Sequence, residues 1–267
     1  MPSPERRPRS LALENIYSPD FVKNLFDQMS GSYDRMNYIT SLGFSLRWRK
    51  QFLRPLVASE EPLEVLDLLT GMGETWGFIL EKFPKANVTA LDFSTEMLRG
   101  AQARNQRKFA GRIRLVQQDA LANELGGGRF DLVVCSFGLK TFDPNQCTQL
   151  AREVERVLKP GGRFAFVEVS KPDSRILRML YGFYLGMVIP VLGKALGNPE
   201  SYRMLWRYVE KFVDAKKAMD TFRDCGLDAR YESYFYGCAT GFSGTKFAQP
   251  QGPRTRGQTS LGSPSPL

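Results

Sequence analysis

The sequence of 267 residues contains no histidine, and its four cysteines are widely spaced and form no Cys-x-x-Cys pair. Histidine and closely paired cysteines are the usual ligands of structural zinc, so no metal site is expected. Cys135 lies in the apolar run 130–137 and is expected to be a small buried hydrophobic residue. Unpaired cysteines favour a reducing compartment, so we expect a cytoplasmic protein.

Long apolar runs are also missing. The N-terminus is rich in Pro and Arg and lacks the apolar stretch of a signal peptide. One segment, 179–193, has no charged residue, but it has 15 residues and contains Gly182, Gly186 and Pro190. It is too short and too interrupted to span a bilayer. We expect it to form either a buried lid helix or a surface that touches lipid at the membrane periphery.

The formal net charge is +9, although no long basic run occurs. Such an excess of Lys and Arg is compatible with a solvated surface, or with attraction to nucleic acid, anionic lipid or an acidic substrate. The absence of a basic run favours the solvated surface, so nucleic acid is not expected as a partner.

Strand-like and helix-like patterns alternate along residues 16–247, which predicts one α/β domain with a parallel sheet and right-handed crossovers. The two ends, 1–15 and 248–267, are expected to be disordered, because the C-terminal tail has almost no apolar residues. Expected strands lie at 63–69, 87–91, 113–116, 130–135, 163–168, 228–235 and 238–247. Expected helices include 46–56, 75–83, 94–108 and 215–225, with helical lid segments over 17–56 and 173–212.

A glycine turn follows the first expected strand, where Gly71 and Gly73 allow a sharp bend and close approach of a ligand. Asp92 ends the second strand, 25 residues after Asp67, where a carboxylate can accept hydrogen bonds from both ribose hydroxyls of a nucleoside cofactor. Asp119 follows the third strand and can meet the amine of adenine. The alternative is that Asp92 is a helix cap and Asp119 a turn former.

Trp76 stands where a dinucleotide-binding turn would have its third glycine. The bulky indole is unfavourable for the close helix packing that this glycine allows, so a nicotinamide dinucleotide is not expected. A nucleoside cofactor without phosphate has no need of that glycine.

Several longer blocks are similar to one known family. The most specific are the N-terminal block 26–37, with Ser41-Leu42-Gly43 and Trp48 after it, and Glu-x-Ser-Lys-Pro at 168–172. Less specific blocks lie at 136–139, 157–163 and 201–205. With these blocks, residues 17–247 resemble the ubiquinone/menaquinone biosynthesis C-methyltransferase family. The resemblance implies a class I methyltransferase with a Rossmann-like, mostly parallel sheet, an antiparallel closing strand and a helical lid.

The resemblance implies S-adenosyl-L-methionine as the cofactor. It places cofactor contacts on Met72, Asp92, Asp119 with Ala120, and Ser136; Asp67, Gly71 and Gly73 of the glycine turn complete the expected set. The chain departs from the family pattern in three places, one of which is 241–246, where the family commonly has a histidine and this chain has none. Met72 stands where the family usually has threonine, and Phe137-Gly138-Leu139-Lys140-Thr141 stands where it usually has Phe-Gly-x-Arg-Asn. Lysine keeps the positive charge but not the bidentate geometry of arginine.

Methyl transfer to carbon or oxygen of a hydrophobic aromatic acceptor, such as a quinone precursor, is the expected reaction. Two alternatives stay open: an O- or N-methyltransferase of a secondary metabolite, which the altered Lys140-Thr141 pair favours, and a catalytically silent cofactor-binding scaffold. A nucleic-acid methyltransferase would usually carry an Asn/Asp-Pro-Pro-aromatic motif where this chain has residues 136–139.

Candidate catalytic residues are few because histidine is absent. Lys140 or Arg203 is expected to stabilise an oxyanion, and Asp34 or Tyr202 to handle a proton. The alternatives are that Tyr202 is a packing residue and Lys140 a plain surface lysine. The apolar segment 176–192 is expected either to cover a hydrophobic acceptor or to be ordinary core. A homodimer is a further expected assembly.

Overall fold

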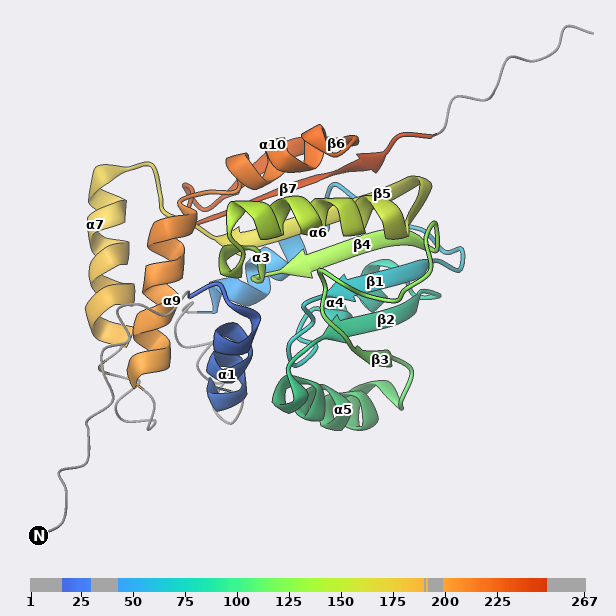
Figure 1. Cartoon of the computed structure of the whole chain (residues 1–267), viewed down its shortest axis with the longest axis horizontal. Coiled ribbons are helices and arrows are strands. Elements are labelled where there is room, and N and C mark those ends of the chain that lie inside the picture. Colours follow the sequence, from blue (N-terminus) through green and yellow to red (C-terminus); the bar gives the residue numbers. More distant parts are fainter. Residues whose placement is uncertain (1–15, 30–42, 190, 192–198, 249–267) are drawn as a thin grey trace, which may run out of the picture.

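A computed structural model of the chain describes residues 16–29, 43–189, 191 and 199–248. Its strands are β1 (Glu64–Leu68), β2 (Asn87–Asp92), β3 (Arg114–Gln117), β4 (Phe130–Ser136), β5 (Leu158–Val169), β6 (Leu227–Tyr234) and β7 (Ala239–Lys246). They form one sheet in the order β3-β2-β1-β4-β5-β7-β6 (Figure 1). Strands β1 to β5 pair in parallel, and β7 is antiparallel to both β5 and β6. The predicted mostly parallel sheet with an antiparallel closing strand is confirmed.

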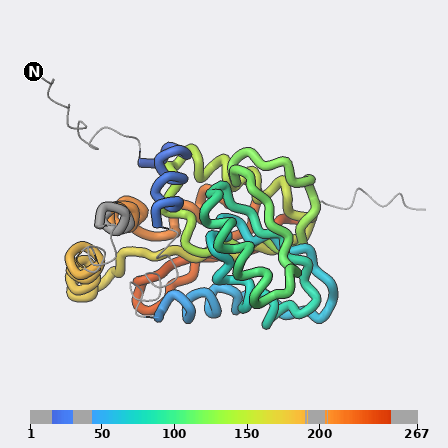
Figure 2. The backbone as a smooth tube through the Cα atoms, turned by 90° about the horizontal axis from the view of Figure 1, so that it is seen from below, coloured from blue at the N-terminus to red at the C-terminus, as the bar shows by residue number. Residues whose placement is uncertain are grey.

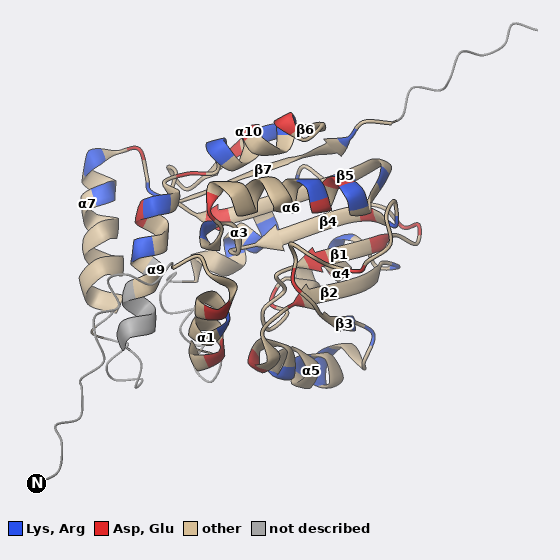
Figure 3. Cartoon of the chain, in the orientation of Figure 1, with Lys and Arg blue, Asp and Glu red and all other residues tan. Residues whose placement is uncertain are grey.

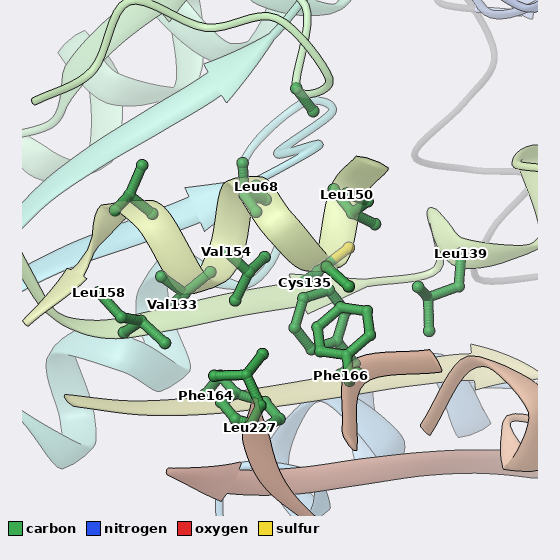
Figure 4. Packing of buried hydrophobic residues seen from close by; sticks show 14 of the residues in the cluster. Leu68, Val133, Cys135, Leu139, Leu150, Val154, Leu158, Phe164, Phe166 and Leu227 are labelled. Carbon is green, nitrogen blue, oxygen red and sulfur yellow. The ribbon is translucent and has the colours of Figure 1, made fainter. Parts of the chain in front are cut away.

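Helices cover both faces of the sheet. Successive residues of β4 point to opposite faces, so Val133 and Cys135 join one core cluster while Leu132 and Val134 join the other. Figure 4 shows the first cluster, in which strand side chains pack against a helix. Both faces are therefore apolar, as the unbroken hydrophobic run of β4 predicts. The first cluster is covered by α6 (Pro144–Val157) and α10 (Lys216–Asp224), and the second by α3 (Phe44–Gln51), α4 (Trp76–Lys82) and α5 (Thr95–Phe109).

A third group of helices lies beyond the carboxyl ends of the parallel strands (Figures 1 and 2). It comprises α1 (Pro19–Met29), α7 (Arg175–Phe183), the π-helical turn η3 (Tyr184–Val188) and α9 (Pro199–Phe212). These helices share a small core of their own, which includes Leu25, Leu185, Ile189 and Tyr208. Among the described residues, no helix is both long and apolar enough to cross a membrane.

Most elements lie within a residue or two of the expected bounds, and two differ by five residues at one end. The helix expected at 46–56 is α3, which ends at Gln51 and is followed by turns; its Trp48 and the following Phe52 are buried in the core of the second cluster. The strand expected at 163–168 begins earlier, because β5 already pairs with β4 at Leu158 and then shifts register. Gly161, with a φ of 76°, allows this irregularity. The expected tails fall almost entirely outside the described residues.

Candidate active site

The strand order reverses direction between β1 and β4, and a pocket opens where the carboxyl ends of β1, β2 and β4 meet, as is usual for doubly wound sheets. The pocket contains about 700 Å³ of space not filled by atoms, part of it open to solvent. Small organic ligands usually bind in a concave site of this kind, beyond the carboxyl ends of the strands. The lining residues are Tyr17, Pro19, Val22, Phe26, Leu69, Gly71, Asp92, Phe93, Met97, Asp119, Ala120, Leu121, Ser136, Phe137, Gly138, Thr141, Phe142 and Gln146.

The glycine turn after β1 is built on left-handed backbone. Leu69, Gly71 and Gly73 have φ angles of 54°, 57° and 80°, respectively. Thr70 closes the turn, because its N–H donates to Leu91 of β2 and its carbonyl accepts from Gly73. Gly71 lines the pocket, and because it has no side chain, its backbone forms part of the pocket wall.

Asp67 lies beneath this turn and is 1% exposed. Its Oδ2 accepts hydrogen bonds from the Thr70 hydroxyl at 2.5 Å and from the indole N–H of Trp76 at 3.0 Å. Burial raises the pKa of this carboxyl to about 7, although both hydrogen bonds favour its ionised form. Asp67 therefore fixes the glycine turn from below, and it is not among the described residues that line the pocket.

The buried carboxyl of Asp67 makes stability depend on pH. Its pKa is near 3.8 in an exposed setting and about 7 in the folded chain. At a pH between these two values, the folded state therefore holds a proton that the unfolded state releases. The free energy of unfolding should therefore fall as the pH rises from about 4 to about 7. Asp67→Asn keeps an oxygen for Thr70 and Trp76 and should flatten this fall. Urea unfolding of the unaltered chain and of Asp67→Asn between about pH 4 and pH 7 tests this prediction. If the free energy of unfolding falls equally steeply with pH in both, Asp67 is not the group responsible.

Asp92 ends β2 and is 6% exposed. Its Oδ2 accepts from the Gly71 N–H at 2.8 Å and its Oδ1 from the Ser94 N–H at 3.0 Å. Burial raises the pKa of Asp92 to about 6, against the effect of these main-chain hydrogen bonds. Each carboxylate oxygen has a second lone pair with which it could accept a ligand hydroxyl. The cap of α5 is Ser94, whose Oγ accepts from Met97, so the alternative of Asp92 as the helix cap is wrong.

Asp119, Ala120 and Ser136 line the same pocket. The Asp119 Oδ1 accepts from the N–H of Leu121 at 2.9 Å, so this side chain both forms its turn and faces the pocket. The Ser136 hydroxyl lies 2.8 Å from that of Thr75 at the start of α4. Of the eight expected cofactor residues, the pocket brings together Gly71, Asp92, Asp119, Ala120 and Ser136.

Met72 and Gly73 are not among the described lining residues. The Met72 side chain packs on α5 instead, because a Cβ at Gly100 would fall 2.2 Å from the Met72 Cε. Gly73 lies over the Trp76 ring, where a Cβ would fall 2.6 Å from the ring carbons. The glycine at 73 thus makes room for the indole, which then reaches Asp67.

Helix α1 forms the pocket wall opposite the sheet, with Val22 and Phe26 facing the space. Two polar contacts hold this helix in place. Asp27 accepts a short hydrogen bond of 2.5 Å from the Ser94 hydroxyl, and the Gln146 amide donates to the Tyr17 carbonyl at 2.9 Å. The sequence predicted a helical lid segment over 17–56, but it gave no signal for the contacts of Asp27 and Gln146, because each depends on a distant segment.

Lys140 is 4% exposed, so the alternative of a plain surface lysine is wrong. Its Nζ lies 2.8 Å from Oε1 of the fully buried Glu168 on β5 and also donates to the Phe137 carbonyl at 2.7 Å. Glu168 further accepts from the main-chain N–H groups of Lys140 and Val169. The ion pair therefore fixes the turn after β4, whose residues Phe137, Gly138 and Thr141 line the pocket.

The remaining expected catalytic residues cannot be placed. Asp34 lies outside the described residues, and the side chains of Tyr202 and Arg203 on α9 are likewise not described. In segment 176–192, Ile176, Met179 and Phe183 are exposed, so core packing does not account for them. Within the described part of the chain, this segment contributes no residue to the pocket lining.

The lining residues fit S-adenosylmethionine. Among those described, two are acidic, Asp92 and Asp119, and none is Lys or Arg. A pocket with this charge suits a cationic sulfonium ligand and is unfavourable for the phosphates of a dinucleotide. Phe93 and Leu121 add apolar side chains to the same pocket. When bound, this cofactor supplies an already activated methyl group.

Comparison with known proteins agrees with this fit. The ubiE/COQ5 methyltransferase family matches residues 14–246. A demethylmenaquinone methyltransferase of Lactiplantibacillus plantarum is 33% identical over 233 residues, which cover 85% of this chain and 97% of that protein. The demethylmenaquinone methyltransferase of Thermus thermophilus is 35% identical over 219 residues, covering 80% and 96% of the two chains.

A solved S-adenosylmethionine-dependent methyltransferase from Thermotoga maritima has a similar fold, with a TM-score of 0.59 and 17% identity over 84% of this chain and 98% of that one. The prediction of a methyltransferase that depends on S-adenosylmethionine is confirmed. The chain belongs to the ubiE/COQ5 methyltransferase family.

Proposed function

We propose that this methyltransferase transfers the methyl group of S-adenosylmethionine to the ring of a demethylated quinone precursor that carries an apolar tail. The observation that carries the proposal is one pocket with two unlike walls: carboxylates at the strand ends, and apolar side chains on α1. The relatives named demethylmenaquinone methyltransferase support this choice of acceptor.

On the cofactor side, Asp92 would accept both ribose hydroxyls while it stays held by the N–H groups of Gly71 and Ser94. Asp119 would accept from the adenine amine. The exposed backbone of Gly71 would lie against the remainder of the cofactor. Because Asp92 is already fixed by two hydrogen bonds, little conformational freedom is lost when a ligand binds.

On the acceptor side, Val22, Phe26 and Phe142 offer an apolar wall for an aromatic ring and the start of its tail. Thr141 and Gln146 add polar side chains to the pocket lining. The chain's main contribution to the reaction would be alignment of the ring atom with the methyl group, together with exclusion of water.

Lys140 would support this alignment as a positioning residue, since its Nζ is engaged by Glu168 and Phe137. A direct contact between Lys140 and an acceptor oxyanion stays a prediction. So do an oxyanion contact of Arg203 and proton transfer by Asp34 or Tyr202. Contact with a membrane surface and a homodimer also stay predictions.

The test is a methyl-transfer assay with labelled S-adenosylmethionine and a short-tailed demethylated naphthoquinone, in its reduced form, next to a panel of small phenols and amines. Methylation of the reduced naphthoquinone supports the proposal. Transfer to phenols or amines alone would favour an enzyme of secondary metabolism. Cofactor binding without any transfer would favour the silent scaffold.

Cofactor affinity should depend on pH through Asp92. The ionised carboxylate accepts the ribose hydroxyls and attracts the sulfonium, so protonation as the pH falls through about 6 should weaken binding. Below that point, the dissociation constant should rise up to roughly tenfold per pH unit. Calorimetry with S-adenosylmethionine measures it. Asp92→Asn has no titrating group here and should show a flat profile; an equally steep profile in that variant would assign the effect elsewhere.

A further inference from the structure

Helix α7 and the turn that follows it carry a continuous apolar stripe on the outside of the protein. Its residues recur at helical spacing, and each is between 57% and 71% exposed: Ile176, Met179, Leu180, Phe183, Met187 and Val191. The structure buries none of the residues of α7 itself. Single exposed apolar residues are common, but a row of six over several helical turns is not.

The opposite side of this segment is held by the protein, which fixes the direction of the stripe. Leu185 and Ile189 are buried in the small core that they share with α1 and α9. Trp206 of α9 packs close to Gly182 and Gly186, where an added Cβ would fall 3.3 Å and 3.6 Å from the indole ring. The stripe therefore cannot turn inward without loss of these contacts.

The charged residues near the stripe favour an anionic membrane over a second copy of the chain as its partner. Residues 174–189 contain no Asp or Glu and two cations, Arg175 and Arg178. Figure 3 shows the Lys and Arg positions of α7 towards one end of the helix, while the rest of its ribbon carries no charged residue. An apolar face bordered by cations is typical of a helix that lies in the surface of an anionic membrane. A second copy of the chain, paired through the same face, would bring like charges together.

We propose that the α7–η3 stripe docks onto the surface of an anionic lipid bilayer, with its apolar side chains among the headgroups and acyl chains. Lipid phosphates would meet Arg175 at the basic end of α7. Helix α1, which forms one wall of the pocket, shares its core with η3 through Leu25 and Met29. Docking would hold that wall beside the membrane surface.

Flotation of the full chain with vesicles tests the surface. Binding is expected to vesicles of phosphatidylcholine with about one third phosphatidylglycerol, and to weaken in high salt or with phosphatidylcholine alone. Met179→Gln/Phe183→Gln/Met187→Gln should lower the bound fraction at least roughly tenfold. The matched control is Val57→Gln/Tyr236→Gln/Phe247→Gln, which removes three large side chains elsewhere that are 63–80% exposed, against 57–68% for the three on the stripe. It should bind like the unaltered chain.

Three outcomes would overturn the proposal: no vesicle binding by the unaltered chain, equal binding by the two triple variants, or a dimer in sedimentation that only the α7 variant loses. Methylation of a water-soluble acceptor, or S-adenosylmethionine binding where no acceptor is turned over, should be unchanged in the α7 variant. This control separates loss of docking from loss of folding. It also keeps the result independent of the proposed acceptor.

Discussion

Replacement of Asp92 by alanine is expected to raise the dissociation constant for S-adenosylmethionine roughly a hundredfold, which corresponds to about 3 kcal/mol. Two hydrogen bonds from ribose hydroxyls to a buried carboxylate would be lost, and bonds to a charged partner are the strong ones. The variant also removes the acceptor for the Gly71 N–H, which is held at 2.8 Å in the unaltered chain. The glycine turn would then lose one of the contacts that fix it against β2.

Calorimetry at a pH near 8 measures this effect with Asp92 fully ionised, since its pKa is about 6. Asp131→Ala is the matched control, because Asp131 lies at the other end of the parallel strands, where it pairs with Lys159. It should bind the cofactor like the unaltered chain. If Asp92→Ala binds with unchanged affinity, the ribose does not lie at the end of β2, and the proposed orientation of the cofactor is wrong.

The sequence is informative about this site wherever a functional residue ends a strand. Gly71, Asp92, Asp119 and Ser136 follow strands that can be identified from apolar runs, and parallel strands bring their carboxyl ends to one edge. Their convergence follows from the order of the elements, so it could be predicted without knowledge of any contact between side chains.

Contacts between distant segments could not be predicted in this way. Asp27 meets Ser94 across 67 residues, and Gln146 meets Tyr17 across 129 residues. Neither pair leaves a periodic signal, because each depends on how α1 is placed over the sheet. Lys140 was interpreted as a catalytic or a surface residue for the same reason: its partner Glu168 comes from the neighbouring strand, 28 residues later.

Asp67 is a further case in which the role of a residue could not be predicted from the sequence. A carboxylate beside a glycine turn was expected to bind the cofactor, but here it is used by Thr70 and Trp76 beneath the turn. The indole at position 76 was interpreted only as unfavourable for a dinucleotide, so its structural role was missed. Its ring N–H is one of the donors that stabilise the buried acid.

Glu168→Ala should cause the largest loss of stability, about 3–5 kcal/mol, because it leaves the ammonium of Lys140 buried without its counter-ion. Glu168 is fully buried and Lys140 is 4% exposed, so water cannot replace the lost carboxylate without local opening. Two main-chain N–H groups, of Lys140 and Val169, lose their acceptor as well. The melting temperature should fall by about 10 °C.

Lys140→Met/Glu168→Gln is the informative partner of this variant. It removes both charges and leaves one amide oxygen, which can accept from only one of the two N–H groups, because that of Lys140 donates to Oε2 and that of Val169 to Oε1. Part of the lost stability, roughly half, should therefore return. Lys159→Met, which removes a lysine that is 41% exposed from its pair with Asp131, should cost less than about 1 kcal/mol. Denaturant unfolding of the unaltered chain and of the three variants measures these losses of stability. Equal losses in the buried and the exposed pair would mean that water reaches Lys140.

The same pair links stability to catalysis. Because Lys140 and Glu168 hold the turn that carries Phe137 and Thr141 into the pocket, Lys140→Ala should lower turnover more than cofactor affinity. If the lysine only positions this turn, the double variant that restores stability should also restore part of the turnover. If Nζ contacts the acceptor directly, stability should return while turnover stays low, because methionine carries no charge. Turnover measured beside unfolding in these variants therefore distinguishes a positioning residue from a catalytic one.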